Sequence, residues 1–148
     1  MVDVKCEIVI QRPRAAVAGF AADPDNAPTW YANIGSAVHR GGPPVGVGTL
    51  VDFGARFLGR ELKYTYEFIE WVPGSRLVMR TSQGPFPMQT TYTWSDEGSA
   101  TRMVLANTGE PAGFSKVAGF LMAPMMRRAM GKDLRKLKAL LESGAADR

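Results

Sequence analysis

The first residues of the chain alternate between apolar and mostly polar side chains. The segment VDVKCEIVIQ (2–11) places an apolar residue at every second position, a period typical of a half-buried β-strand. Pro13 stops this alternation, and proline suits the first turn of a helix because an N–H there has no intrahelical partner. The pattern predicts an opening strand, followed by a short helix that ends near the Asp23-Pro24 pair.

The next segment, DPDNAPTWYANI (23–34), mixes helix caps and breakers with large apolar side chains. Trp30, Tyr31 and Ile34 fall within twelve residues that also hold two prolines. This composition predicts a second short helical turn that leads into a strand. The two short helices are expected to form a V-shaped hairpin.

Between residues 36 and 108, turn signals separate a series of short apolar segments. The turn signals are GGPPVGVG, LGRE, VPGS, QGPFP and SDEGS. They predict five or six antiparallel strands in succession. Alternation assigns one face of these strands to the interior. The inward positions are Leu62, Tyr64, Tyr66, Phe68, Met88, Thr90, Tyr92, Trp94, Met103, Leu105 and Asn107.

The last part of the chain, from about 114 to 143, has apolar residues at a spacing of three and four. This spacing predicts one amphipathic helix, roughly 40 Å long at the usual rise per residue. Gly119, Pro124 and Gly131 interrupt the pattern. Proline inside a helix removes a backbone donor and crowds the preceding turn, so we expect a kink near Pro124.

Length and composition favour a single α+β domain spanning 1–148. A chain of 148 residues can bury a real core without a disulfide or a structural metal. The single Cys6 and the single His39 predict neither a disulfide scaffold nor a metal site, and no cofactor motif is present. With neither a signal peptide nor a transmembrane segment evident, the expected location is the cytoplasm, as a monomer or homodimer.

The excess positive charge gathers near the end of the chain. The formal net charge is +4, and basic residues recur from Arg127 to Lys138. Such a cluster can meet an anionic membrane or nucleic acid. Because Asp133 and Glu142 interrupt it and aromatic residues are absent, we interpret it as a solvated helix face. The prediction is no nucleic-acid partner, with weak peripheral membrane contact left open.

The order of elements, together with three segments, resembles the START-like (SRPBCC) superfamily, in its polyketide cyclase/dehydrase and lipid-transport branch with the birch-pollen-allergen-like fold. The segments are EIVIQRPRAAVAGFAADPDNAPTWY, GVGTLVDFGARFLGRELKYTYEFIEWVPGSRLVMRT and MAPMMRRAMGKDLRKLKALLE. The resemblance implies a helix-grip fold, in which a curved antiparallel sheet and a long C-terminal helix enclose a cavity. It also implies that Trp30 packs between the helix hairpin and the sheet.

Adaptable and aromatic side chains are the candidates for the cavity wall. Methionine fills irregular apolar space, and a tyrosine hydroxyl can orient a ligand on an otherwise apolar surface. For any single residue, ordinary core packing remains an alternative. The predicted ligand-binding residues are Trp30, Tyr64, Tyr66, Met88, Tyr92, Trp94, Met103, Leu105, Leu121, Met122 and Met125.

Few residues suggest catalysis. His39 is a weak acid/base candidate because it titrates near neutrality, but its place before a glycine-proline loop suggests an exposed strand end. Alternation places Arg56 and Arg80 on the solvent side. The GGPPVGVG segment lacks the context of a phosphate-binding loop, and we interpret it as a connection over the cavity mouth.

These features predict a domain that binds or carries a hydrophobic or aromatic small molecule, such as a lipid, a polyketide-like compound or an isoprenoid. The alternative is a cyclase or dehydrase acting in the same cavity. Its weakness is the lack of predicted inward ionisable residues. A regulator that binds a protein partner is a further alternative.

Overall fold

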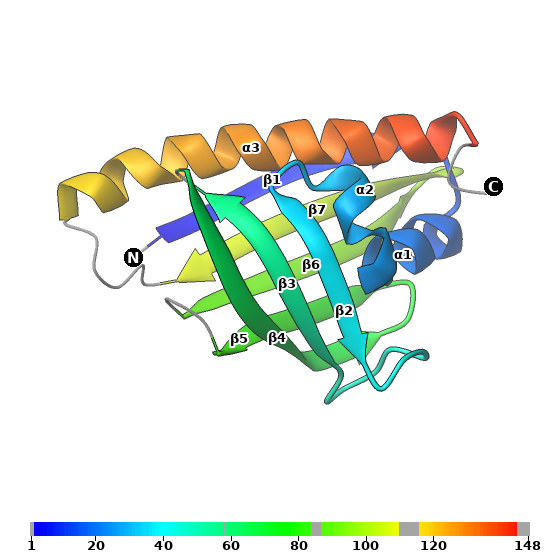
Figure 1. The fold of residues 1–148 in the computed structure, drawn as a ribbon. Coiled ribbons are helices and arrows are strands. Elements are labelled where there is room, and N and C mark those ends of the chain that lie inside the picture. Colours follow the sequence, from blue (N-terminus) through cyan, green and yellow to red (C-terminus); the bar gives the residue numbers. More distant parts are fainter. Residues whose placement is uncertain (1, 58, 84–86, 110–115, 145–148) are drawn as a thin grey trace.

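The computed structural model describes residues 2–57, 59–83, 87–109 and 116–144, and it has the α+β fold predicted from the sequence (Figure 1). Two short helices follow the first strand, and a long helix follows the last. The elements are β1 (Val2–Ile10), α1 (Arg14–Ala22), the 3-10 turn η1 (Pro24–Asn26), α2 (Ala27–Trp30), β2 (Ile34–Arg40), β3 (Leu50–Phe57), β4 (Arg60–Val72), β5 (Arg76–Gln83), β6 (Met88–Glu97), β7 (Ala100–Gly109) and α3 (Lys116–Glu142).

The strands form one antiparallel sheet in the order β1-β7-β6-β5-β4-β3-β2. Consecutive strands pair directly, while α1 and α2 carry the chain from β1 at one edge to β2 at the other (Figure 1). The pairing places Phe53 opposite Tyr64 and Thr90 opposite Asn107. Because directly paired residues share a face, each pair projects from the same side of the sheet.

Helix α3 crosses the concave side of the sheet along β1, and among the described ranges no helix or strand lies over its outer side (Figure 1). Its inward stripe is buried, with Met130, Leu134, Leu137 and Leu141 each at most 4% exposed. This stripe follows the three-and-four spacing seen in the sequence. The helix continues through Pro124, whose side chain is exposed.

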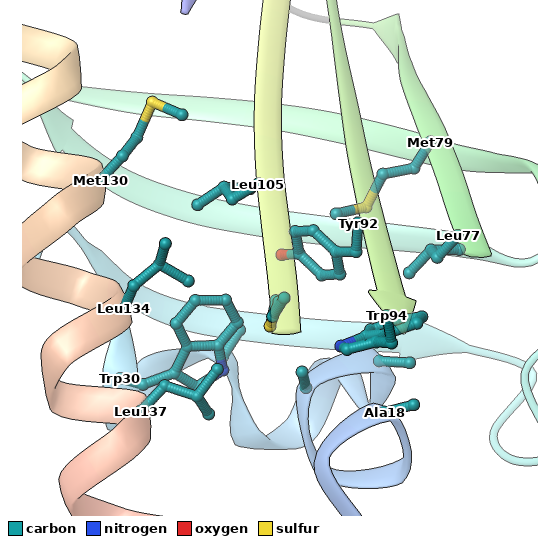
Figure 2. Packing of buried hydrophobic residues seen from close by; sticks show 14 of the residues in the cluster. Ala18, Trp30, Leu77, Met79, Tyr92, Trp94, Leu105, Met130, Leu134 and Leu137 are labelled. Carbon is teal, nitrogen blue, oxygen red and sulfur yellow. The ribbon is translucent and has the colours of Figure 1, made fainter. Parts of the chain in front are cut away.

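Trp30 stands at the junction of the helices and the sheet. Its side chain is 1% exposed, and its ring centroid is 5.9 Å from that of Tyr92 on β6. Figure 2 shows Trp30 beside Leu134 and Leu137 of α3. The residue therefore joins α2, α3 and the sheet, which extends the placement implied by the family resemblance.

Candidate functional site

A cavity of about 190 Å³ lies between the concave face of the sheet and the first half of α3. Its wall is mostly apolar, because inward positions of β3 to β6 face the methionine-rich side of the helix. Such a lining is typical of sites for small organic molecules. The apolar residues of the wall are Ile34, Phe53, Ala55, Leu62, Met79, Met88, Met122, Met126, Ala129 and Met130.

Three aromatic rings form one part of this wall. The centroids of Tyr64 and Tyr66 are 5.3 Å apart with nearly perpendicular planes, and Phe53 lies 5.7 Å from each. Tyr64 and Tyr66 project together because they are two residues apart on β4. Phe53 joins them through its pairing with Tyr64, so the sheet offers a rigid aromatic surface to the cavity.

A chain of hydrogen bonds crosses the middle of the sheet at the cavity wall. The hydroxyls of Tyr66 and Thr90 are 3.0 Å apart, and Thr90 donates to Asn107 Oδ1 at 2.5 Å. Asn107 Nδ2 also donates a weak hydrogen bond to the sulfur of Met130, at 3.4 Å. The register of β6 and β7 brings Thr90 and Asn107 together, and both residues line the cavity.

A second polar group lies where α2 meets α3. The hydroxyls of Tyr31 and Tyr92 are 2.5 Å apart, and burial raises the pKa of both phenols, so both are neutral at physiological pH. Asp133 of α3 lines the same side of the cavity and is 5% exposed. One of its carboxyl oxygens accepts a hydrogen bond of 3.0 Å from the backbone N–H of Ala32.

Burial raises the pKa of the Asp133 carboxyl, although the Ala32 N–H and the charges of Lys132 and Lys136 oppose this shift. The raised pKa means that the group holds its proton to a higher pH than an exposed aspartate does. A carboxyl of this kind can donate or accept a proton in an apolar site.

The position of Asp133 corrects the interpretation of the basic stretch. The sequence suggested that this residue interrupts a solvated face, whereas it points inward, between Met130 and Leu137 on the buried stripe. Asp133 is three residues after Met130 and four before Leu137, and this helical spacing could have predicted its inward position from the sequence. The cavity therefore has the inward ionisable residue that the sequence analysis did not find.

The predicted binding residues divide into three groups. Tyr64, Tyr66, Met88, Tyr92 and Met122 line the cavity. Trp30, Trp94, Met103 and Leu105 do not line it; each is at most 4% exposed within the packed core. Met125 is 49% exposed on the outside of α3, and the side chain of Leu121 lies outside the described residues.

Packing by other elements explains the four buried residues that do not line the cavity. Trp94, Met103 and Leu105 point inward as alternation predicts, and Trp30 of α2 lies where the family resemblance placed it. All four lie where α1, α2 and the second half of α3 fill the concave side. Figure 2 shows Trp94 close to α1, and it is paired with Met103 across β6 and β7. Strand alternation identifies the face of a residue but not the elements that cover it.

Tyr31, Thr90, Asn107 and Asp133 are cavity residues that the predicted site omitted. Thr90 and Asn107 were assigned to the inward face, but no sequence signal marked them as partners. Tyr31 directly follows the buried Trp30. Its hydroxyl meets that of Tyr92 because of the path the chain takes after α2, which no sequence pattern indicates. Pairing between distant strands and helices therefore assembled this part of the site.

His39 and the loop after β2 lie away from the cavity. His39 is the second-last residue of β2, so it lies at a strand end as expected, but it pairs with the buried Val51 and is partly buried on the concave side rather than exposed. It is five positions beyond the cavity residue Ile34, roughly 16 Å along the strand. The GGPPVGVG loop follows at that far end, and none of its residues lines the cavity, so the prediction that it covers the mouth is wrong.

The exposed arginines agree with the predicted alternation. Arg80 is exposed, and Arg56 is exposed at the rim of the cavity with its guanidinium 3.6 Å from the Glu61 carboxylate. Within the described ranges, no three His, Cys, Asp or Glu side chains gather as they would to hold a metal ion. No helix in the same part of the chain is long and apolar enough to cross a bilayer.

Comparisons with solved structures identify the fold. TTHA0849 of Thermus thermophilus superposes with a TM-score of 0.82 and 22% identity, covering 96% of this chain and 98% of that chain. The ZhuI aromatase/cyclase of a Streptomyces species has a TM-score of 0.79 and 14% identity over 97% and 94% of the two chains. Ara h 8.0201 has a TM-score of 0.69 and 13% identity over 95% and 97%.

At these identities the structural likeness establishes a shared fold, which supports the predicted helix-grip arrangement. A comparison with curated proteins found no match. The family described as polyketide cyclase / dehydrase and lipid transport matches residues 1–142. This match covers nearly the whole chain and agrees with the resemblance drawn from the three sequence segments. The chain therefore belongs to the polyketide cyclase/dehydrase and lipid-transport family.

Proposed function

We propose that the protein binds a small, flat, mainly apolar molecule that carries hydroxyl or carbonyl groups. The observation that supports this most directly is the cavity itself, where an aromatic wall meets hydrogen-bonding side chains. Aromatic rings favour stacked or edge-to-face contact with a flat ligand. A few polar groups on an apolar wall orient a ligand and determine its specificity.

The polar groups of the wall suit a ligand that both donates and accepts hydrogen bonds. In the Tyr31–Tyr92 pair one hydroxyl donates to the other, so one O–H remains for a ligand acceptor. Asn107 has two amide hydrogens, and only a weak sulfur contact uses one of them. A saturated hydrocarbon would leave these groups without partners, which is unfavourable in an apolar site.

The cavity volume limits the size of the ligand. An engineered protein cavity of about 150 Å³ accepts benzene. At about 190 Å³, this cavity suits a compact aromatic compound in its present form. A long lipid or polyketide chain would require α3 to move away from the sheet, since Met122, Met126 and Met130 close that side.

Fluorescence titration with 2-naphthol tests the proposal, with naphthalene as the ligand that lacks the hydroxyl. We expect 2-naphthol to bind more tightly, by roughly 2- to 10-fold, which corresponds to one net hydrogen bond of about 0.5–1.5 kcal/mol. Ala129→Phe places a ring in the cavity and should abolish binding of both. Ala139→Phe, on the exposed side of the same helix, is the matched control and should bind normally.

If Ala129→Phe and Ala139→Phe bind both probes equally well, the probes do not occupy the cavity. No binding by the unaltered protein would count against a compact aromatic ligand. Equal affinity for the two probes would remove the role of the polar wall and leave an unselective apolar site.

Asp133 favours a second candidate function, that of a dehydrase or cyclase. Removal of water from a β-hydroxy ketone breaks a Cα–H bond and the Cβ–OH bond. The Asp133 carboxylate can accept the Cα proton, and the carboxylic acid so formed, favoured by its raised pKa, can give that proton to the departing hydroxyl, which leaves as water. Asp133 lines the cavity, so its carboxyl can reach a bound molecule. The enzyme alternative was weak because no inward ionisable residue was predicted, and Asp133 is such a residue.

The enzyme candidate is tested with an aryl β-hydroxy ketone, whose dehydration produces an enone that absorbs in the ultraviolet. Asp133→Asn should abolish enone formation while it preserves 2-naphthol binding. Leu137→Met, a volume-conserving change on the same buried stripe, is the control and should keep activity. Failure of the unaltered protein to form enone would leave binding as the better-supported function.

A further inference from the structure

The outer side of α3 carries a row of positive charges without counterions. The row, called the basic face, consists of Arg127, Arg128, Lys132, Arg135 and Lys136, and all five side chains are exposed. None of them forms a side-chain hydrogen bond or ion pair with the described part of the chain. In Figure 1, no helix or strand of the described residues lies over this side of α3.

The acidic residues of α3 do not neutralise the basic face. Asp133, the one acidic residue between Lys116 and Leu141, is turned into the cavity. Glu142 accepts hydrogen bonds from Lys138 Nζ at 2.6 Å and from the Gln11 backbone N–H at 2.8 Å. The basic face therefore contains no acidic side chain, although the charges of Lys132 and Lys136 still act on the buried Asp133 carboxyl.

The stability of the helix does not explain this arrangement. Arg128 and Lys132, and Lys132 and Lys136, are like-charge pairs at a spacing of four residues, which destabilise a helix. The helix dipole favours cations in the last turn, but the last turn of α3 has no basic residue. An anionic partner outside the protein would relieve the repulsion.

Apolar side chains adjoin the basic face. Met125 is 49% exposed and Pro124 is exposed, one turn before Arg128. Met125 also lies next to Met122 and Met126, which line the cavity. A helix that combines basic residues with exposed apolar residues can lie in the headgroup region of an anionic bilayer.

We infer that the outer side of α3 docks on an anionic phospholipid surface. The basic face contacts the headgroup phosphates, and Met125 enters the boundary between headgroups and acyl chains. Met122 and Met126 line the cavity from the inner side of the same turns of α3, so docking would leave only the helix itself between the lipid and the cavity, which brings the site close to the membrane if the proposed binding function holds. Docking itself does not depend on an occupied cavity.

A lipid surface fits these observations better than a nucleic acid does. Single-stranded nucleic acids require aromatic side chains for stacking, and the basic face has none. The exposed methionine would gain nothing from a phosphate backbone, whereas it gains apolar surroundings at a bilayer.

Vesicle co-sedimentation tests this inference, with phosphatidylcholine vesicles compared with vesicles that also contain phosphatidylserine. We expect binding only to the mixed vesicles, weakened by added salt. A quadruple variant should bind mixed vesicles more weakly, with the affinity falling about fivefold for each charge removed. Its substitutions are Arg128→Gln, Lys132→Gln, Arg135→Gln and Lys136→Gln. Met125→Ser should reduce binding further when combined with any one of these changes.

The control variant removes the same charge elsewhere, through Lys5→Gln, Arg60→Gln, Lys63→Gln and Arg80→Gln, all exposed. It should retain binding if the basic face is the docking surface. Equal loss of vesicle binding in the two variants would overturn the inference. So would a failure of the unaltered protein to bind mixed vesicles, or a finding that it binds DNA or an acidic protein but not vesicles. Titration with 2-naphthol in all variants tests the cavity separately.

Discussion

At the scale of single residues, the cavity combines apolar contact with a few polar groups whose placement decides their chemistry. Asp133 illustrates this, because the same carboxyl on the outer side of α3 would be an ordinary solvated charge. Inside, its one backbone donor, the N–H of Ala32, does not compensate for the loss of water. The residue therefore has a measurable effect on stability.

We expect Asp133→Asn to change how stability depends on pH. The folded state holds this proton more tightly than the unfolded state, so stability falls as pH rises from the ordinary aspartate pKa through the raised pKa. Relative to the asparagine variant, the unaltered protein should lose stability across this interval, by at most about 1.4 kcal/mol for each pH unit. Thermal unfolding of both proteins across this pH interval measures it, and a relative gain with rising pH would contradict the assignment.

Trp30 is the residue whose loss should destabilise the fold most clearly. Trp30→Ala removes a ring that is 1% exposed and should lower the free energy of unfolding by about 3–5 kcal/mol. Trp30→Phe should cost less, since Trp30 Nε1 has no hydrogen-bond partner among the described residues and the change loses only volume. Denaturant unfolding compares the three proteins. A loss below about 1 kcal/mol for the alanine variant would mean that the packing around Trp30 is loose.

At the scale of elements, α3 both completes the core and closes the cavity. Its first half presents Met122, Met126 and Met130 to the cavity, whereas its second half packs Leu134, Leu137 and Leu141 into the core. The second half is the firmer anchor because its leucines are at most 1% exposed. Ligand entry is therefore expected to involve movement of the first half, where Pro124 lies.

Pro124→Ala tests this role of α3. The substitution restores a backbone donor inside the helix and should raise stability, by up to about 3 kcal/mol. If the first half of α3 moves at Pro124, uptake of 2-naphthol in a stopped-flow experiment should slow. Gly131→Ala is the matched control: it should add about 1 kcal/mol of stability without slowing uptake, because the new Cβ meets only the end of the Arg135 side chain. Unchanged uptake in Pro124→Ala would remove the gating role.

At the scale of the whole molecule, the sheet, the helix hairpin and α3 form one core, so ligand binding in the cavity should stabilise the entire fold. The core cluster contains residues from all three helices and from β1, β3, β4, β5, β6 and β7. A ligand that binds only the folded state lowers the unfolding equilibrium constant by a factor of one plus the ratio of the free ligand concentration to Kd, so the stabilisation rises with the logarithm of the ligand concentration.

We expect 2-naphthol at about 100 times its dissociation constant to add about 2.7 kcal/mol to the free energy of unfolding. For a domain of this size, that should raise Tm by roughly 5–10 °C. Differential scanning calorimetry measures the shift, and Ala129→Phe should show none. A shift that persists in Ala129→Phe would point to binding elsewhere on the protein.

Local patterns along the chain were enough to predict the kind of fold and the direction of most side chains. Alternation in β4 and β6 predicted that Tyr64, Tyr66 and Tyr92 point inward, because the period of a strand is a local property. Helical spacing similarly predicted the buried leucines of α3. These inferences succeeded because each depends only on neighbours along the chain.

Which of the inward residues face a cavity depends on how the elements pack together. Trp94 and Tyr92 both point inward from β6. Trp94 lies close to α1 (Figure 2), whereas Tyr92 lines the cavity. The rotation of α3 against the sheet likewise decides that Asp133 points toward the cavity and contacts the Ala32 N–H. The same rotation leaves the basic face without an acidic side chain. Rotation and coverage are set by packing between segments far apart in sequence, which no local pattern contains.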